Sequence, residues 1–144
     1  MVFEYLPWLR ALLVGDATAT LNGTEGDNGV YVALIDTGVY TPDPAHEFYS
    51  QIPSGAIIGT PQEILNKSVL TNGKFTGSGV SFVNVTGASI EAVAFYRKNA
   101  GADTTWRLVF YDTEIINVTT GLAGFPLNPN TGNLNLTWNV GGIF

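Results

Sequence analysis

Alternation of apolar and polar side chains with a period of two most constrains the fold of this chain. Near the end, residues 134–140 (LNLTWNV) place apolar side chains at every second position, and residues 17–22 (ATATLN) show the same pattern. Successive side chains of a β-strand point to opposite faces, so each run would bury one face and expose the other. The sequence therefore predicts a strand at both places.

Further segments are rich in Val, Ile, Phe, Tyr and Trp, the residues favoured in strands. Those at 30–35 and 106–111 lack clean alternation, so we expect them to be central strands covered on both faces. The pair Asn72-Gly73 predicts a hairpin with a type I′ turn. The predicted segments are 30–37 (VYVALIDT), 66–71 (NKSVLT), 80–85 (VSFVNV), 91–97 (EAVAFYR), 105–112 (TWRLVFYD) and 114–119 (EIINVT).

Two short helices are expected beside these strands. Pro7 opens one near residues 6–14 (LPWLRALLV), and Asp43 caps the other, within residues 41–53 (TPDPAHEFYSQIP). We divide the chain into an apolar N-terminal arm, residues 1–15, and one domain, residues 16–144. About eight strands with turns between them predict an all-β fold, an antiparallel β-sandwich of the jelly-roll type.

Composition narrows the classes of function. Only 12% of the 144 residues are charged, about half the usual share, so much of the surface must be uncharged. Such a surface favours a subunit of an assembly. The net charge of −6 and six scattered Lys and Arg disfavour nucleic-acid binding.

No stretch approaches the ~20 apolar residues that span a bilayer, so we expect no membrane partner. The N-terminus differs from a signal peptide, because its only early charge is the acidic Glu4, and Pro7 and Arg10 interrupt its apolar run. We therefore expect a protein that is used without export.

Residues 33–38 read ALIDTG, which matches the active-site signature of aspartic proteases. Those enzymes pair two such Asp residues, whereas this chain has one copy and would have to work as a homodimer. Val39 stands where Ser or Ala is usual, and the apolar-apolar-Gly motif at 57–59 follows too soon. We interpret the tripeptide as a strand end, at which Asp36 accepts a hydrogen bond from its own downstream backbone.

Other chemistry has weaker signals. His46 is the single histidine, so no cluster of histidines can hold a metal, and we expect its ring to be solvated or locally bonded. The loop 22–29 (NGTEGDNG) carries Glu25, Asp27 and Asn28 but misses the EF-hand spacing. The chain has no cysteine, which removes disulfides and thiolate sites. We expect no catalytic residue, no cofactor and no metal.

A set of segments occurs in a characteristic order. Its central stretch runs from a strand through Asp36-Thr37 and Tyr40-Thr41 to Glu47-Phe48. The segments are PWLRALLVG (7–15), VYVALIDTGVYTPDPAHEFYSQIP (30–53), TNGKFTGSGVSF (71–82), EAVAFYRKNA (91–100), WRLVFYDTE (106–114) and GNLNLTWNVGGIF (132–144). In this order, over nearly the whole chain, the sequence resembles a family of small virion proteins of tailed bacteriophages.

The resemblance implies a capsid cement, or decoration, protein. Such a protein would be made in the host cytoplasm and would bind the outer capsid surface. It would commonly sit there as a homotrimer at three-fold positions and bridge neighbouring major capsid proteins. The family names no catalytic residues. Since some members are described as tail or fibre proteins, a receptor- or carbohydrate-binding tail module is the alternative.

Contact with a partner is expected at three places. The first is the N-terminal arm, because Trp, Tyr and Arg most often anchor interfaces, although the arm could equally pack on its own domain. The second is the long loop 119–133, where two apolar side chains could instead cap the barrel end. The third is the turn between residues 40 and 49. The candidate residues are Phe3, Tyr5, Trp8, Arg10, Tyr40, Tyr49, Phe125 and Leu127.

Overall fold

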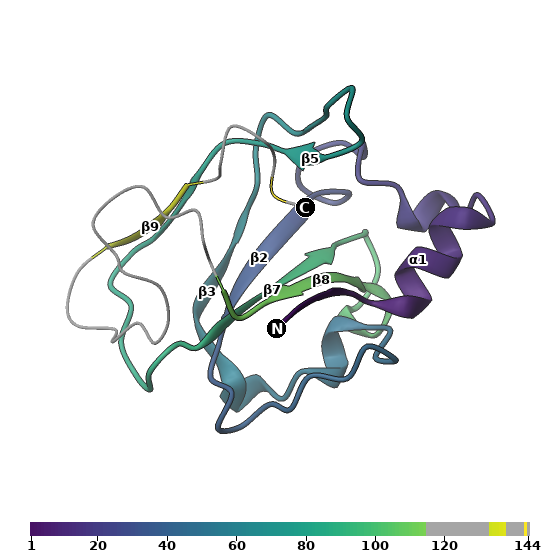
Figure 1. Cartoon of the computed structure of the whole chain (residues 1–144). Helices are drawn as coiled ribbons and strands as arrows, with labels where there is room; N and C mark the ends of the chain where they lie inside the picture. The colour runs from purple at the N-terminus through teal and green to yellow at the C-terminus, as the bar shows by residue number, and fades with distance from the viewer. Residues whose placement is uncertain (115–132, 138–142, 144) are drawn as a thin grey trace.

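A computed structural model describes residues 1–114, 133–137 and 143 (Figure 1). A five-stranded antiparallel sheet forms its centre, in the order β1-β8-β7-β2-β3. The strands are β1 (Val2–Glu4), β2 (Val30–Ile35), β3 (Ile57–Glu63), β7 (Ala92–Arg97) and β8 (Arg107–Asp112). Two small sheets pair β4 (Ser68–Val69) with β5 (Phe75–Thr76) and β6 (Val80–Phe82) with β9 (Leu134–Leu136). One α-helix, α1 (Leu6–Leu13), and four short 3₁₀ helices complete it, so the all-β prediction with a short helix is confirmed.

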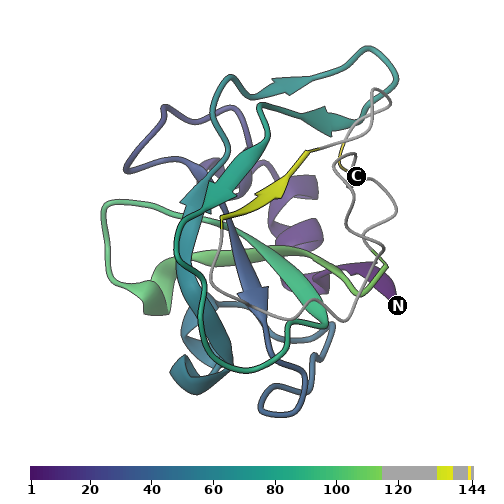
Figure 2. The same cartoon turned by 90° about the vertical axis from the view of Figure 1, so that its left-hand side faces the viewer.

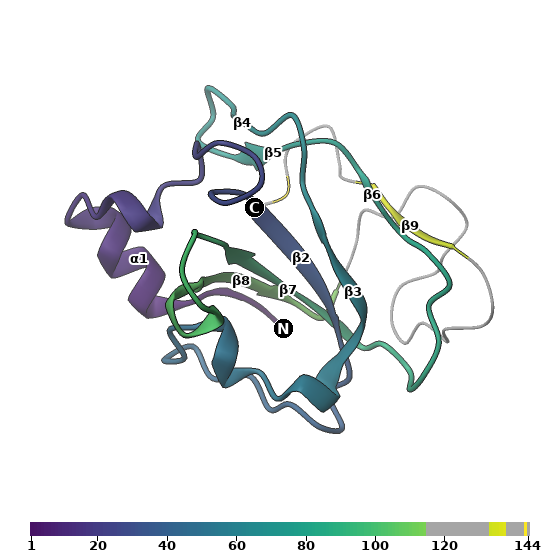
Figure 3. The ribbon, with the colours of Figure 1, turned by 180° about the vertical axis from the view of Figure 1, so that it is seen from behind.

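The central strands are covered on both faces, as their unbroken apolar runs predict. Every residue of β7 is buried, and β2 pairs with it in register from Val30 opposite Arg97 to Ile35 opposite Ala92. Figures 1 and 3 show the connecting segment 36–56 on one side of this sheet and the two small sheets on the other. Figure 2 shows α1 beside the sheet, beyond β2. The apolar core therefore lies on both sides of the main sheet.

Both edge strands of the main sheet escaped prediction. β1 has three residues and pairs with β8 through Phe3 opposite Tyr111, which is too short for a periodic signal. β3 contains Gly59, at φ +68°, and Pro61, which both weaken a strand signal. Pro61 is tolerated because β3 lies at the edge of the main sheet, where a missing N–H donor breaks no pairing.

The strand expected at residues 17–22 is wrong. Residues Ala17–Ala19 form the 3₁₀ helix η1. The Asp16 carboxylate accepts a hydrogen bond from the Thr18 backbone N–H at 2.8 Å, and the Ala19 N–H donates to the Asp16 carbonyl at 3.0 Å. This capping of a tight turn outweighs the alternating pattern.

The helix expected within residues 41–53 is also wrong. Asp43 does cap a turn, because its carboxylate accepts from the Ala45 N–H at 2.8 Å. The next residues are then extended, since the Leu108 N–H donates to the Glu47 carbonyl at 2.9 Å and Phe48 bridges Arg107. Pairing with the start of β8 uses the backbone groups that a helix would need. Only the 3₁₀ helices η2 (Tyr49–Gln51) and η3 (Ser54–Ala56) follow.

The hairpin predicted at Asn72-Gly73 connects β4 and β5, but its turn type differs. The Gly73 N–H donates to the Leu70 carbonyl at 2.9 Å, and the Leu70 N–H donates to the Lys74 carbonyl at 2.7 Å. Gly73 takes φ +83° and Asn72 does not take a positive φ. This is a three-residue loop, a tight turn followed by a left-handed glycine, in place of the type I′ turn. All but the first residue of the strand expected at 114–119, and the end of the last predicted strand, lie outside the described residues.

The ALIDTG segment ends a strand, as interpreted from the sequence. β2 stops at Ile35, and the Asp36 carboxylate accepts a hydrogen bond from the Gly38 N–H at 2.7 Å. The Asp36 carbonyl also accepts from the Tyr40 N–H at 3.2 Å. The carboxylate and the carbonyl of Asp36 thus both stabilise the turn that leads into segment 36–56.

Candidate interaction surface on helix α1

Helix α1 begins and ends at well-defined signals. Pro7 lies in its first turn, where a missing N–H costs nothing. At its end Gly15 takes φ +77°, the Gly15 N–H donates to the Leu12 carbonyl, and the Asp16 N–H donates to the Ala11 carbonyl at 2.9 Å. This pair of bonds is a Schellman motif, which satisfies carbonyls at a helix C-terminus. The helix predicted from residues 6–14 is thus confirmed.

Two side chains of α1 attach it to the core. Trp8 and Ala11 are the buried residues of the helix. The Trp8 indole N–H donates to the Ala19 carbonyl at 2.8 Å, and just before the helix the Tyr5 N–H donates to the Val109 carbonyl at 3.0 Å. The helix is therefore held firmly against the sheet by one narrow stripe.

Apart from Arg10 and the half-buried Pro7, the remaining residues of α1 are apolar and exposed. Leu13 is 78% exposed and the following Val14 is 75% exposed. An ordinary surface helix places charged residues opposite its buried stripe, whereas Arg10 is the single charged residue of this one. Large exposed apolar patches are the surfaces at which soluble proteins bind partners, so this face is the candidate interaction surface. We name it the α1 surface: Leu6, Leu9, Arg10, Leu12, Leu13 and Val14.

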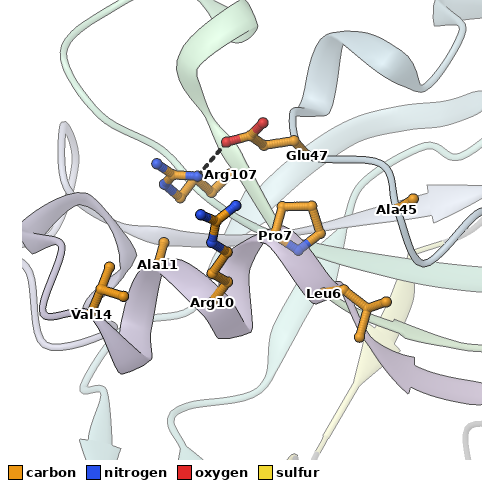
Figure 4. A pocket seen from close by; sticks show the side chains of 8 residues that line it. All are labelled: Leu6, Pro7, Arg10, Ala11, Val14, Ala45, Glu47 and Arg107. Atoms are coloured by element: carbon orange, nitrogen blue, oxygen red, sulfur yellow. Dashed lines mark hydrogen bonds and ion pairs between the residues drawn. The ribbon is translucent and has the colours of Figure 1, made fainter.

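A pocket of about 520 Å³ flanks α1 on each side. The first lies between the helix, Ala45 and Arg107, and Figure 4 shows its lining. The second lies between α1 and the β4–β5 hairpin, where Leu9 and Leu12 face Val69 and Phe75. The α1 surface therefore continues into two hollows that side chains of another molecule can fill.

Arg107 forms the polar wall of the first pocket. Its Nη1 pairs with Glu47 Oε1 at 2.7 Å, its Nη2 pairs with Asp16 Oδ2 at 2.9 Å, and its Nε donates to Thr18 Oγ1 at 2.9 Å. The guanidinium also lies over the Phe48 ring, 5.6 Å from its centroid. Hydrogen bonds from Thr18, and then the charge of Arg107, lower the pKa of Asp16 below its ordinary value. The network fixes the loop after α1 to the start of β8.

Most aromatic residues that the sequence suggested as contacts lie inside the chain. Tyr5, Trp8 and Tyr40 are at most 5% exposed, so they pack on their own fold and present no ring to a partner. Phe3 is half-buried and stacks on Tyr111. Tyr49 is also half-buried, with its ring centroid 4.2 Å from that of Tyr96. Arg10 is exposed within the α1 surface, and Phe125 and Leu127 lie outside the described residues.

Sequence reasoning missed the leucines that form the α1 surface. It weighted Trp and Tyr, which are the commonest interface anchors but also the residues that this small core needs. A signal was present, because residues 6–14 are apolar at every position except Arg10. A helix of eight residues that packs on one side of a sheet cannot bury all of them.

A second cluster, of aromatic rings, lies where β2 begins and β7 ends. Tyr31, Tyr96 and Trp106 stack in series, with centroids 5.6 Å and 5.7 Å apart. The Lys98 ammonium lies 5.4 Å from the Tyr31 centroid and 5.3 Å from the Trp106 centroid. Tyr49 joins them, and burial raises its pKa to about 12. These contacts join β2, β7 and the residue before β8 through a stack of rings.

The polar groups with possible chemistry are used to hold loops. His46 Nδ1 lies 2.9 Å from the Tyr40 hydroxyl, and Glu25 Oε1 accepts from the Asn66 N–H at 2.8 Å. Within residues 1–114, 133–137 and 143, no three His, Asp or Glu side chains are grouped so that they could hold a metal ion. None of the helices in the described part of the chain has the length and apolar character needed to span a membrane.

Comparisons with known proteins leave the family open. Neither a protein-family model nor a curated protein matches this chain. The functional conclusion therefore depends on the residues described above, above all on the α1 surface.

Proposed function

We propose that the chain is a structural protein of a tailed-bacteriophage virion, a capsid cement protein that binds the outer capsid surface and bridges major capsid proteins. The observation that carries the proposal is the α1 surface, where exposed apolar side chains gather on one helix beside a well-packed core. The family resemblance of the sequence supplies the setting. The major capsid protein is the proposed partner, and the chain itself, as a homotrimer, the second.

The physical requirements of such a role agree with the surface. A cement protein stabilises a shell by burying area across subunit seams, and few charges should be desolvated there. Fully burying one Leu or Val side chain contributes roughly 1.5–3 kcal/mol, so Leu13 and Val14 alone offer several kcal/mol to a partner. Because Trp8 already fixes the helix to the core, binding would order little additional structure.

The charge of the remaining surface also suits a particle component. The net charge is −6, and the α1 surface carries only Arg10. An acidic exterior repels other virions and nucleic acid, while the helix, which carries no acidic residue, remains available for attachment. Attachment through α1 would then leave the acidic faces of the domain toward solvent.

Co-sedimentation with capsids of the encoding phage that lack this protein tests the proposal. We expect the wild-type chain to sediment with them and to raise the temperature at which they release DNA. Leu13→Glu, on the α1 surface, should abolish both effects. Val83→Glu is the matched control, since Val83 is 65% exposed and lies outside α1, and it should bind as wild type does.

Other outcomes separate the alternatives. Wild-type protein that ignores such capsids but binds host cells or purified tails would replace the cement role by a tail role. Equal binding of wild type and Leu13→Glu would remove α1 from the contact. Peptidase activity that Asp36→Asn abolishes would establish the dimeric protease instead.

A further inference from the structure

We infer that the pocket between α1 and Arg107 receives an Asp or Glu side chain from an apolar segment of the partner protein, and that Arg10 pairs with that carboxylate. The inference deepens the proposed function, on which the identity of the partner rests. It names the chemistry that the partner should present to this face, and it can be tested without capsids.

Arg10 is the unsatisfied group of the pocket. Its side chain is exposed, and no ion pair or hydrogen bond joins it to any of the residues that the structure describes. Figure 4 shows its guanidinium on the side of α1 that faces Arg107 and Glu47. A guanidinium offers five N–H donors in a planar fork that fits a carboxylate in a bidentate manner.

Arg107, the other cation in the pocket, has no such capacity. All three of its nitrogens are engaged, with Glu47, Asp16 and Thr18. Its side chain is only 14% exposed. An incoming carboxylate would have to break an existing ion pair to reach Arg107, whereas at Arg10 it would displace only water.

The local charge balance favours an acid over a base. Arg10 and Arg107 are balanced here by Asp16 and Glu47, while the whole chain carries −6. An acidic side chain is therefore repelled less at this pocket than over the molecule as a whole. A basic side chain would find both carboxylates already paired with Arg107.

The walls of the pocket strengthen the pairing. They are apolar and come from Leu6, Pro7, Ala11 and Val14, while Ala45 lies across from the helix. Covering these walls with an apolar segment excludes water, and a charge pair interacts more strongly as the effective dielectric constant falls. The volume, about 520 Å³, is ample for a Glu side chain with an apolar neighbour.

Titration with short peptides, followed by NMR of the Arg10 and Ala11 signals, tests the inference. The probes are acetyl-leucyl-glutamyl-leucine amide and its glutaminyl and lysyl counterparts. We expect the glutamyl peptide to bind weakly but measurably, about tenfold more tightly than the other two, and less tightly as salt is added. Arg10→Met should remove the preference for the glutamyl peptide, and Arg10→Lys should restore part of it.

Several results would overturn the inference. These are equal binding of the glutamyl and glutaminyl peptides, tighter binding of the lysyl peptide, no binding of any peptide, or an unchanged preference in Arg10→Met. The urea midpoint of Arg10→Met should equal that of wild type, because Arg10 is exposed and unpaired among the described residues. If the peptides fail while Leu13→Glu still blocks capsid binding, only the inference falls. If the glutamyl peptide binds but the wild-type chain ignores capsids, only the proposed function falls.

Discussion

Leu13→Ala should separate binding from folding, because Leu13 contributes to one and hardly to the other. The substitution removes three carbons, worth about 2.4 kcal/mol when fully buried. Leu13 is 78% exposed in the free chain, so about 1.9 kcal/mol of this is available only to a partner. Binding should weaken about twentyfold, at about 1.4 kcal/mol per factor of ten. Folding should lose only about 0.5 kcal/mol, which the higher helix propensity of Ala partly offsets.

Leu108→Ala is the opposite case and serves as the reference. Leu108 is fully buried in β8, so its truncation should cost about 2–5 kcal/mol of unfolding free energy. Urea unfolding measures folding for both variants, and co-sedimentation with capsids lacking the chain measures binding. A loss above about 1.5 kcal/mol of unfolding free energy in Leu13→Ala, or a binding loss below about threefold, would show that Leu13 does not bind a partner in this way.

Three further predictions concern the domain itself. Burial raises the pKa of Asp112 above its ordinary 3.8. The free energy of unfolding is therefore unaffected by this group below pH 3.8, and it decreases as the pH rises through the folded-state pKa, because the buried carboxylate must then carry a charge. Asp112→Asn should therefore raise the urea midpoint at pH 7 and leave it unchanged at pH 3, and a lower midpoint at pH 7 would contradict this. Asp36→Ala removes the acceptor of the Gly38 N–H and should cost about 1 kcal/mol in urea unfolding. Asp36→Asn keeps an acceptor oxygen and should cost less, so equal losses would argue against the turn. Gly73→Ala forces a side chain into φ +83° and should cost about 1 kcal/mol by the same measurement, whereas a neutral effect would show that the hairpin turn relaxes.

Continuous runs of apolar, strand-forming residues, rather than alternation, identified the parts of the fold where burial dominates. The strands at 30–35, 92–97 and 107–112 are buried on both faces, and their apolar runs show it directly. Pro7 and the apolar residues after it likewise predicted α1. In these segments local preference and tertiary packing agree, which is the condition under which sequence reasoning succeeds.

The remaining elements depend on contacts that no local pattern contains. A single carboxylate, that of Asp16, turns an alternating segment into a 3₁₀ helix. Pairing of Phe48 with Arg107 replaces the helix that Asp43 predicts within residues 41–53. The α1 surface needed the fold as well, because only the structure shows which stripe of an apolar helix is buried.

We propose above all that α1 attaches this protein to the outside of a capsid. A cryo-EM reconstruction of the encoding phage tests it most directly. We expect density for this domain on the outer shell, with Leu13 and Val14 in contact with the major capsid protein. Density for the domain in the tail, or on the shell with α1 facing solvent, would contradict it.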